Sequence, residues 1–217
     1  MPEAVLFDFN GTLSNDEPVL LRIFTELFEE YLGWRMTAEE YFARLAGRSD
    51  EEIVRIAVQE RAGDAPDTVR KLLKQRRERY RALVAGHPTI TPATLELVRG
   101  ISSRGIPLGI VTGAARADVT YVLSNQDIAE LFTSVVCAED VVEGKPDPEG
   151  FLRAAGELNV SPQQTVVFED SIPGLRAARA AGMIRIGVVG TLPAGKLEPE
   201  ADAVLENLDS SAWRLLG

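Results

Sequence analysis

The chain contains a single cysteine, Cys137, so it cannot form an internal disulfide bond. It also lacks any run of about 20 apolar residues, the length that an α-helix needs to cross a bilayer. Its first residues do not have the basic and apolar pattern of a signal peptide. These absences lead us to expect a cytoplasmic protein without a membrane partner, in which Cys137 is a core thiol.

Positive charge is scarce as well. The net charge is −10, and lysine occurs only at positions 71, 74, 145 and 196. A protein that binds nucleic acid or an anionic membrane needs a basic surface, so this charge balance disfavours both kinds of partner. An anionic substrate would therefore have to meet local positive charge.

Two patterns divide the chain of 217 residues, which is long enough for one large domain or a domain with an insertion. Between residues 18 and 84 apolar side chains recur at spacings of three and four, which predicts helices. Thr37 with Glu40 and Ser49 with Glu52 fit the capping box that begins a helix. Elsewhere short apolar runs alternate with helical segments, which is typical of a parallel sheet. The expected strands are 4–8, 108–111, 134–137, 165–168, 184–189 and 203–205.

We therefore predict an α/β fold: a Rossmann-like parallel sheet flanked by helices, with an inserted helical-bundle cap. The core would comprise residues 1–14 and 86–217, and the cap residues 15–85. The two connections between them would form a hinge. Within the cap, the arginine-rich run 76–81 is interpreted as the solvated face of a helix, and Tyr41 as cap core or cap surface.

Asp8 is the first candidate site residue. It follows the apolar run 4–7 directly and precedes a Gly-Thr turn. Its carboxylate should lie at the carboxyl edge of the sheet, where open α/β proteins bind ligands. An exposed nucleophile is the natural interpretation.

Two further strand ends carry candidate phosphate ligands. Thr112 directly follows the strand 108–111 and precedes Gly113 and Ala114, whose backbone amides could approach a phosphate closely. A plain turn is the other interpretation of this segment. Lys145 lies in a loop that two prolines restrict, so it should be held in place. A surface lysine remains the alternative.

The last candidate is the acid pair Glu169 and Asp170, which follows the expected strand 165–168. Adjacent carboxylates repel each other unless a cation or a proton intervenes, and hard oxygen ligands suit Mg²⁺. Asp170 or Ser171 could instead cap the helix that follows.

The order of Asp, Thr, Lys and an acid pair, each at a strand end, resembles the haloacid dehalogenase superfamily. Residues 168–182, together with Lys145-Pro-Asp-Pro, are similar to the branch that holds phosphoglycolate phosphatases and β-phosphoglucomutases. That branch has a helical cap after its first motif. Residues 45–50 resemble the cap loop that contacts the substrate.

The resemblance implies a mechanism of phosphoryl transfer. Asp8 would attack phosphorus and become an aspartyl phosphate. Mg²⁺ would bridge Asp8, the main-chain carbonyl of Asn10 and Asp170, with Glu169 in support.

The resemblance also implies the residues that hold the substrate, a small phosphorylated metabolite. Thr112 and Lys145 would hold the phosphoryl oxygens. Arg48 would contact the substrate when the cap closes, unless it is a solvated arginine. We expect a monomer or a weak dimer.

Asn10 departs from the phosphatase pattern, which has a second Asp at this position. That Asp protonates the leaving oxygen and later takes a proton from water, and an amide can do neither. Such catalysis typically contributes about 10²–10⁴-fold, so we expect a slow or specialised phosphatase. Asn10 is either a natural variant or a substitution that traps the intermediate. Because Gly11 follows it, Asn10 is also prone to deamidation to an acid.

Four other functions stay open. A binder of phosphorylated ligands without turnover would keep the same pocket. A β-phosphoglucomutase would need acid–base help in both directions. A phosphonate hydrolase would need Lys71 or Lys74 to form a Schiff base with the substrate. The dehalogenase branch lacks the metal-binding acid pair, whereas Glu169 and Asp170 are present in this chain.

Overall fold

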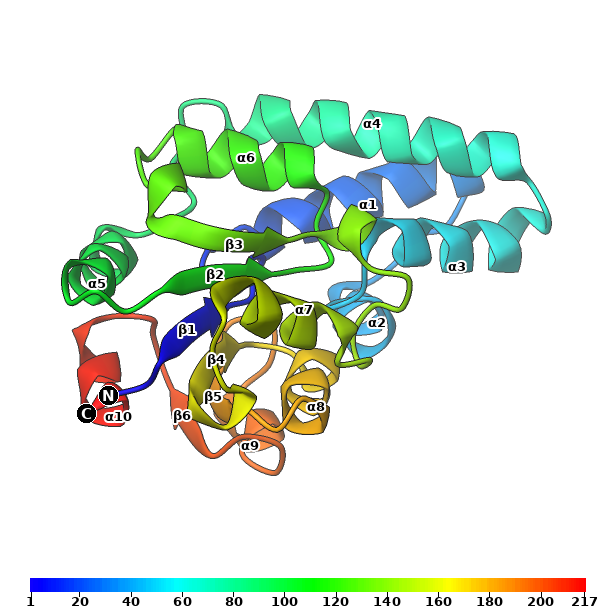
Figure 1. Cartoon of the computed structure of the whole chain (residues 1–217). Helices are drawn as coiled ribbons and strands as arrows, with labels where there is room; N and C mark the ends of the chain where they lie inside the picture. The colour runs from blue at the N-terminus through cyan, green and yellow to red at the C-terminus, as the bar shows by residue number, and fades with distance from the viewer.

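The computed structural model describes all residues, 1–217, and its centre is a six-stranded parallel sheet. The strand order is β3-β2-β1-β4-β5-β6. The strands are β1 (Ala4–Phe7), β2 (Leu108–Val111), β3 (Phe132–Val136), β4 (Thr165–Glu169), β5 (Ile184–Val188) and β6 (Ala203–Leu205) (Figure 1). The predicted α/β fold is confirmed, and every expected strand is present with ends shifted by no more than two residues.

Helices cover both faces of the sheet because successive strand side chains point to opposite sides. Leu6 and Val167 pack with α7 (Glu149–Leu158) and α8 (Ile172–Ala180). On the other face, Phe7 packs in the cluster that includes residues of α5 (Pro92–Ser103) and α6 (Arg116–Ser124). Two short helices complete the chain: α9 (Ala194–Leu197) beside β5 and β6, and α10 (Trp213–Leu216) at the end. Cys137 is buried after β3, as predicted.

Four helices form a separate block, which we call the helical block: α1 (Glu17–Leu32), α2 (Ala38–Arg44), α3 (Asp50–Ala62) and α4 (Pro66–Val84). It lies beyond the carboxyl ends of the strands (Figure 1). Both predicted capping boxes are present, at Thr37 for α2 and at Ser49 for α3. None of the helices combines the length and the apolar character that spanning a membrane requires.

The two connections to the helical block run side by side. The amide of Asn15 donates a hydrogen bond to the carbonyl of Thr89 at 2.8 Å. The hydroxyl of Ser14 donates to the hydroxyl of Thr89 at 2.7 Å. The entering and leaving segments are therefore tied together at the base of the helical block.

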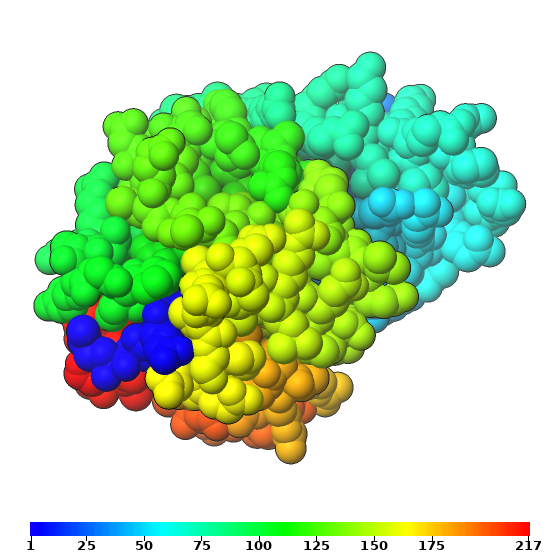
Figure 2. Space-filling model, in the orientation of Figure 1, coloured from blue at the N-terminus to red at the C-terminus, as the bar shows by residue number.

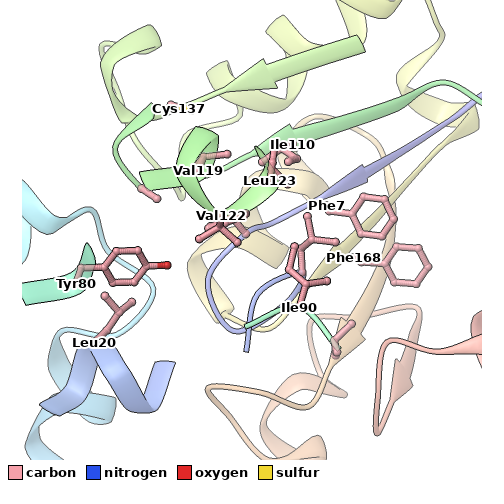
Figure 3. Packing of buried hydrophobic residues seen from close by; sticks show 14 of the residues in the cluster. Phe7, Leu20, Tyr80, Ile90, Ile110, Val119, Val122, Leu123, Cys137 and Phe168 are labelled. Atoms are coloured by element: carbon pink, nitrogen blue, oxygen red, sulfur yellow. The ribbon is translucent and has the colours of Figure 1, made fainter. Parts of the chain in front are cut away.

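One hydrophobic core extends from the sheet into the helical block. Phe28 and Trp34 stack with ring centroids 5.5 Å apart, and both belong to the same buried cluster as Phe7. Leu20 of α1 and Tyr80 of α4 belong to this cluster as well and extend it into the helical block (Figure 3). The position of the helical block over the sheet is thus stabilised by burial of apolar surface.

Arg76 does not lie on a solvated helix face, and the prediction for the run 76–81 was wrong at this residue. Its side chain is 1% exposed. The guanidinium group pairs with Asp50 of α3, at 3.0 Å from Nε to Oδ2, and with the buried Asp118 of α6. An ion pair therefore joins the helical block to a helix that covers the sheet.

Arg76→Met is expected to lower the free energy of unfolding by about 3 kcal/mol, because it leaves the buried carboxylate of Asp118 with only the guanidinium group of Arg81, at 4.0 Å. Chemical denaturation measures this change. The matched control is Arg70→Met, also on α4, whose ion pair with Asp67 is exposed and should contribute less than about 1 kcal/mol. Equal effects of the two substitutions would contradict the structural role of Arg76.

Candidate active site

The sheet register brings the polar strand ends together. Phe7 of β1 is aligned with Ile110 of β2 and with Phe168 of β4. The residues that follow these strands, Asp8 and Thr112 among them, therefore lie at one edge of the sheet. The chain runs from β1 outward through β2 to β3, and then crosses to β4 on the other side of β1 and runs outward to β6. The edge at β1 and β4 is therefore the switch point at which open α/β sheets bind ligands.

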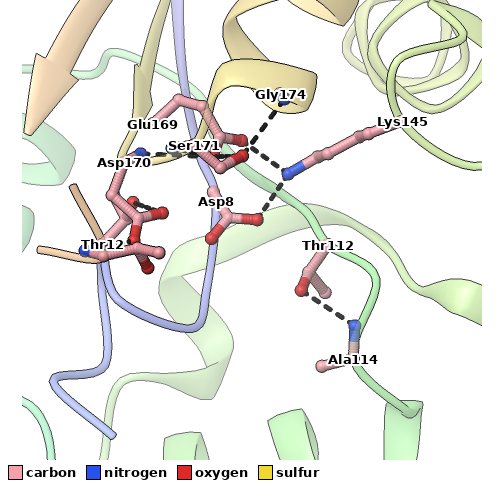
Figure 4. Close-up of polar contacts among 10 residues, drawn as sticks. Asp8, Thr12, Thr112, Ala114, Lys145, Glu169, Asp170, Ser171 and Gly174 are labelled. Carbon is pink, nitrogen blue, oxygen red and sulfur yellow. Dashed lines mark hydrogen bonds and ion pairs between the residues drawn. The ribbon is translucent and has the colours of Figure 1, made fainter. Parts of the chain in front are cut away.

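Lys145 contacts the nucleophile candidate directly. Its Nζ donates hydrogen bonds to Oδ1 of Asp8 and, at 2.6 Å, to Oε2 of Glu169 (Figure 4). Burial lowers the pKa of Lys145, but attraction to Asp8 and Glu169 outweighs this effect, so that the pKa is raised. The lysine is therefore a fixed positive charge beside Asp8.

Negative charge at this edge exceeds what one lysine neutralises. Asp8, Glu169 and Asp170 each offer a carboxylate oxygen, and these oxygens lie within 4.8 Å of one another. Burial, followed by repulsion from Glu169, raises the pKa of Asp8 well above its ordinary value and that of Asp170 to about 8. Three buried carboxyl groups so close together fit a divalent cation, because hard oxygen donors suit Mg²⁺ and its charge would offset their repulsion.

Both oxygens of Glu169 already have hydrogen-bond partners. Oε1 accepts from the amide and the hydroxyl of Ser171, at 3.0 and 2.7 Å, while Oε2 accepts from Lys145. Glu169 thus orients the lysine and the turn into α8. The hydroxyl of Ser171 also accepts from the amide of Gly174 at 3.1 Å, so Ser171 caps α8 and Asp170 does not.

Asp170 is held by two threonines that the sequence analysis did not identify. Its Oδ1 accepts from the hydroxyl of Thr12 at 3.1 Å, and its Oδ2 accepts from the amide of Thr191 at 2.9 Å and from the hydroxyl of the same residue. Thr191 follows β5, so the strand-end pattern that identified Thr112 was also available for Thr191.

Gly11 is required by its backbone and by its surroundings. It has φ +78°, and a Cβ atom at this position would lie 2.1 Å from Oδ2 of Asp170. Residues with a side chain rarely adopt this backbone conformation, and a side chain here would collide with the carboxylate of Asp170. The turn after β1 can therefore approach Asp170 only with glycine here.

The segment after β2 packs tightly and uses one of its amides internally. The hydroxyl of Thr112 accepts a hydrogen bond from the amide of Ala114 at 3.0 Å (Figure 4). The backbone amide of Ala114, which was predicted to approach a phosphate, therefore donates its hydrogen bond to Thr112 in this structure. Gly113 faces the helical block, since a Cβ atom there would lie 3.2 Å from Cα of Ser49.

Arg48 lies at the rim of the site. It lines a small cavity with Asp8 and Asp170, but its Nε donates to the carbonyl of Arg44 at 3.1 Å. A second guanidinium nitrogen lies 3.8 Å from Glu52. Arg48 thus lines the cavity, while its guanidinium group contacts Arg44 and Glu52 of the helical block.

The side chain of Asn10 is fixed by a residue that the sequence analysis passed over. Its Nδ2 donates to Oδ2 of Asp16 at 2.9 Å, and the hydroxyl of Tyr80 donates to the same oxygen. Burial raises the pKa of Asp16, while these two hydrogen bonds lower it. The amide of Gly11, which would have to attack Asn10 in deamidation, donates to the carbonyl of Ser14 at 2.8 Å. That hydrogen bond opposes deamidation in the folded chain.

A larger cleft opens beside the site, between the helical block and the loops after β2 and β3. Its volume is about 590 Å³, and its walls include Arg55, Arg77, Thr112 and Lys145. The surfaces of the helical block and of the residues near 140–150 meet in Figure 2. The cleft reaches Thr112 and Lys145, so it offers space for the non-reacting part of a substrate.

Known proteins resemble this chain over nearly its whole length. It is 32% identical over 219 residues to validoxylamine A 7′-phosphate phosphatase of Streptomyces hygroscopicus subsp. limoneus, covering 100% of this chain and 99% of that protein. It is also 32% identical over 203 residues to the phosphorylated carbohydrates phosphatase of Thermotoga maritima. This similarity covers 93% of this chain and 92% of that protein.

Solved structures show the same fold. CbbY from Rhodobacter sphaeroides, in an Asp-to-Asn variant bound to xylulose-(1,5)bisphosphate, has a TM-score of 0.85 at 31% identity, covering 97% of this chain and 96% of that one. β-Phosphoglucomutase from Clostridium difficile has a TM-score of 0.87 at 21% identity, covering 100% of this chain and 96% of that one. At this level of identity, the similarity shows the fold alone. Residues 5–188 match the family model described as haloacid dehalogenase-like hydrolase. Together with its phosphatase relatives, this match shows that the chain belongs to the haloacid dehalogenase-like hydrolase family, the superfamily that its sequence resembles.

Proposed function

We propose that the chain is a Mg²⁺-dependent phosphatase of small phosphorylated metabolites, which acts through an aspartyl phosphate on Asp8. The observation that carries the proposal is the contact of Asp8 with Lys145 at the sheet edge, beside the buried acid pair Glu169 and Asp170. A protein that only bound phosphate would not need a nucleophile among these acids. Phosphatases among the relatives support the same reaction.

Each residue has a distinct part in this reaction. Asp8 attacks phosphorus, and the positive charge of Lys145 lies beside it, where negative charge on the phosphoryl oxygens must be balanced. The hydroxyl of Thr112 lies at the next strand end and would bind a phosphoryl oxygen. In phosphoryl transfer, positioning and electrostatic stabilisation supply most of the catalysis, so fixed groups of this kind are what the reaction requires.

The metal would be held by Asp8, Asp170 and the main-chain carbonyl of Asn10. Glu169 would support it indirectly through Lys145 and the turn at Ser171. Bound there, Mg²⁺ would neutralise charge and orient a phosphoryl oxygen toward the nucleophile.

We further propose that residues 15–85 act as a cap that opens on its paired connections. The cavity at Asp8 has a volume of only about 30 Å³, so a substrate needs the helical block to move. The relatives named for validoxylamine 7′-phosphate and phosphorylated carbohydrates favour a polyhydroxylated phosphomonoester as the substrate class. A cytoplasmic location and a monomeric or weakly dimeric state remain predictions.

Incubation with Mg²⁺ and a panel of sugar phosphates and para-nitrophenyl phosphate is expected to release inorganic phosphate. EDTA should stop the release, and added Mg²⁺ should restore it, because the acid cluster needs a cation. Acid-quenched protein should carry phosphate on the peptide that contains Asp8. Phosphate release that EDTA does not change would contradict the metal requirement.

Asn10 favours a second candidate, a binder of phosphorylated ligands without turnover. This function would show as tight binding of inorganic phosphate by calorimetry with no release from any substrate of the panel. The phosphonate hydrolase alternative loses support, because Lys71 and Lys74 are exposed on α4 and do not line the cavity.

A further inference from the structure

Glu17, the first residue of α1, lies in the active-site cavity without a part in the reaction described above. The cavity is lined from the sheet edge by Asp8 and Asn10 and from the helical block by Glu17 and Tyr41. Only 6% of the surface of Glu17 is exposed. Its carboxyl group therefore shares an enclosed space with the nucleophile.

One oxygen of Glu17 has no hydrogen-bond partner. Oε1 is inaccessible to solvent and forms no hydrogen bond within the protein. Leaving a buried polar atom unpaired is unfavourable, so such an atom calls for an explanation. Beside the nucleophile, the partners that would satisfy it are the reacting groups themselves: the leaving oxygen and the attacking water.

The other carboxyl groups that line the cavity already have partners. Their contacts are Asp8 with Lys145, Glu169 with Lys145 and Ser171, Asp170 with Thr12 and Thr191, and Asp50 with Arg76. Asp16 also has an unpartnered oxygen, but it does not line the cavity and is bonded to Asn10. Glu17 is thus the carboxyl group of the cavity that remains available for proton transfer.

The surroundings of Glu17 suit proton exchange at neutral pH. Burial raises its pKa to about 7, against a lowering effect of the hydrogen bond with Tyr41. The carboxyl groups that face it come from the start of α1, the end of β1, the start of α3 and the end of β4: Asp16, Asp8, Asp50 and Asp170. A general acid and base works best with a pKa close to the pH of the reaction.

We propose that Glu17 does the acid–base work that the amide of Asn10 cannot do; this inference rests on the proposed phosphatase function. In the first step an oxygen of Asp8 bonds to phosphorus, the bond from phosphorus to the leaving oxygen breaks, and the proton of Glu17 passes to that oxygen.

In the second step a water oxygen bonds to phosphorus and the bond between phosphorus and Asp8 breaks. The carboxylate of Glu17 takes the proton of the water. The products are an alcohol and inorganic phosphate, and both carboxyl groups return to their starting states.

The test compares leaving groups in wild type and Glu17→Gln, which keeps the size of the side chain. The alkoxide of β-glycerophosphate needs a proton to leave, so the variant should lose about 10²–10⁴-fold in turnover of this substrate. The leaving group of para-nitrophenyl phosphate does not need one. Here the variant should release para-nitrophenol in a stoichiometric burst, followed by slow release of phosphate.

Glu39→Gln, at an exposed glutamate of α2, is the matched control and should behave as wild type on both substrates. The pH–rate profile of wild type should have a limb near the pKa of Glu17, and Glu17→Gln should lack it. Glu17→Asp should keep part of the activity and the same limb of the pH–rate profile. If Glu17→Gln does not fold, Glu17→Asp takes its place in the comparison.

Two results would overturn the proposal while leaving the phosphatase function intact. One is an unchanged turnover in Glu17→Gln. The other is an equal loss on both substrates without a burst, which would show that Glu17 only binds substrate. Absence of phosphate release by the wild-type protein would overturn the phosphatase function and this proposal with it.

Discussion

Asp8→Asn is expected to abolish phosphate release from every substrate, with a loss of at least about 10⁴-fold in kcat, because the proposed nucleophile is replaced by an amide. The variant should also form no aspartyl phosphate, so no burst of para-nitrophenol should appear. Rapid-quench measurement of para-nitrophenol and of protein-bound phosphate checks both expectations. Activity within tenfold of wild type would exclude Asp8 as the nucleophile.

The same substitution has a predicted effect on stability that depends on pH. Burial and Glu169 raise the pKa of Asp170 from 3.8 to about 8 and that of Asp8 upward as well. A carboxyl group whose pKa is higher in the folded state stabilises the fold below its unfolded pKa, and this contribution is lost as the pH rises through the folded pKa. The metal-free wild type should therefore lose stability between about pH 4 and pH 8.

Asp8→Asn should weaken this loss, since it removes one of the carboxyl groups that titrate in the acid cluster. Chemical denaturation without metal, at several pH values across this range, measures the slope. Addition of Mg²⁺ should stabilise wild type most at the upper end, where the carboxylates are ionised. A free energy of unfolding that rises with pH in the metal-free protein would contradict the description of the acid cluster.

Lys145→Met is expected to lower kcat/KM by about 10²–10³-fold, because it removes the fixed positive charge beside Asp8, the proposed nucleophile. The substitution also leaves Asp8 and Glu169 without their shared partner in a buried site. Removing one partner of a buried ion pair typically costs about 3–5 kcal/mol, so the metal-free variant should be markedly less stable.

Steady-state kinetics with Mg²⁺ and denaturation without it separate the two effects of Lys145→Met. The matched control is Lys196→Met, at an exposed lysine of α9, which should change neither quantity. If added Mg²⁺ restored the stability of Lys145→Met and left its activity low, the lysine would be confirmed as a group that acts on the phosphoryl transfer itself. A variant with wild-type kcat/KM would contradict that role.

Local patterns were sufficient to predict the α/β fold and the edge of the sheet at which the candidate site lies. Strand side chains alternate with a period of two, and helices begin at side chains that accept the first amides, so Thr37 and Ser49 were recognisable from a few neighbouring residues. Parallel strands end at one edge. The proximity of Asp8 to Thr112 and to the acid pair then follows from the strand order and register.

Burial and pairing between distant segments were decided by the tertiary structure alone. Arg76 is separated from Asp118 by 42 positions, and in the sequence it cannot be distinguished from the solvated arginines that follow it. Glu17 looks like an ordinary first-turn glutamate, yet the helical block folded over β1 encloses it beside Asp8. Its position, and with it the proposed source of the protons that Asn10 cannot supply, depends on packing across the whole molecule, because desolvation and unpaired atoms arise only when remote elements meet.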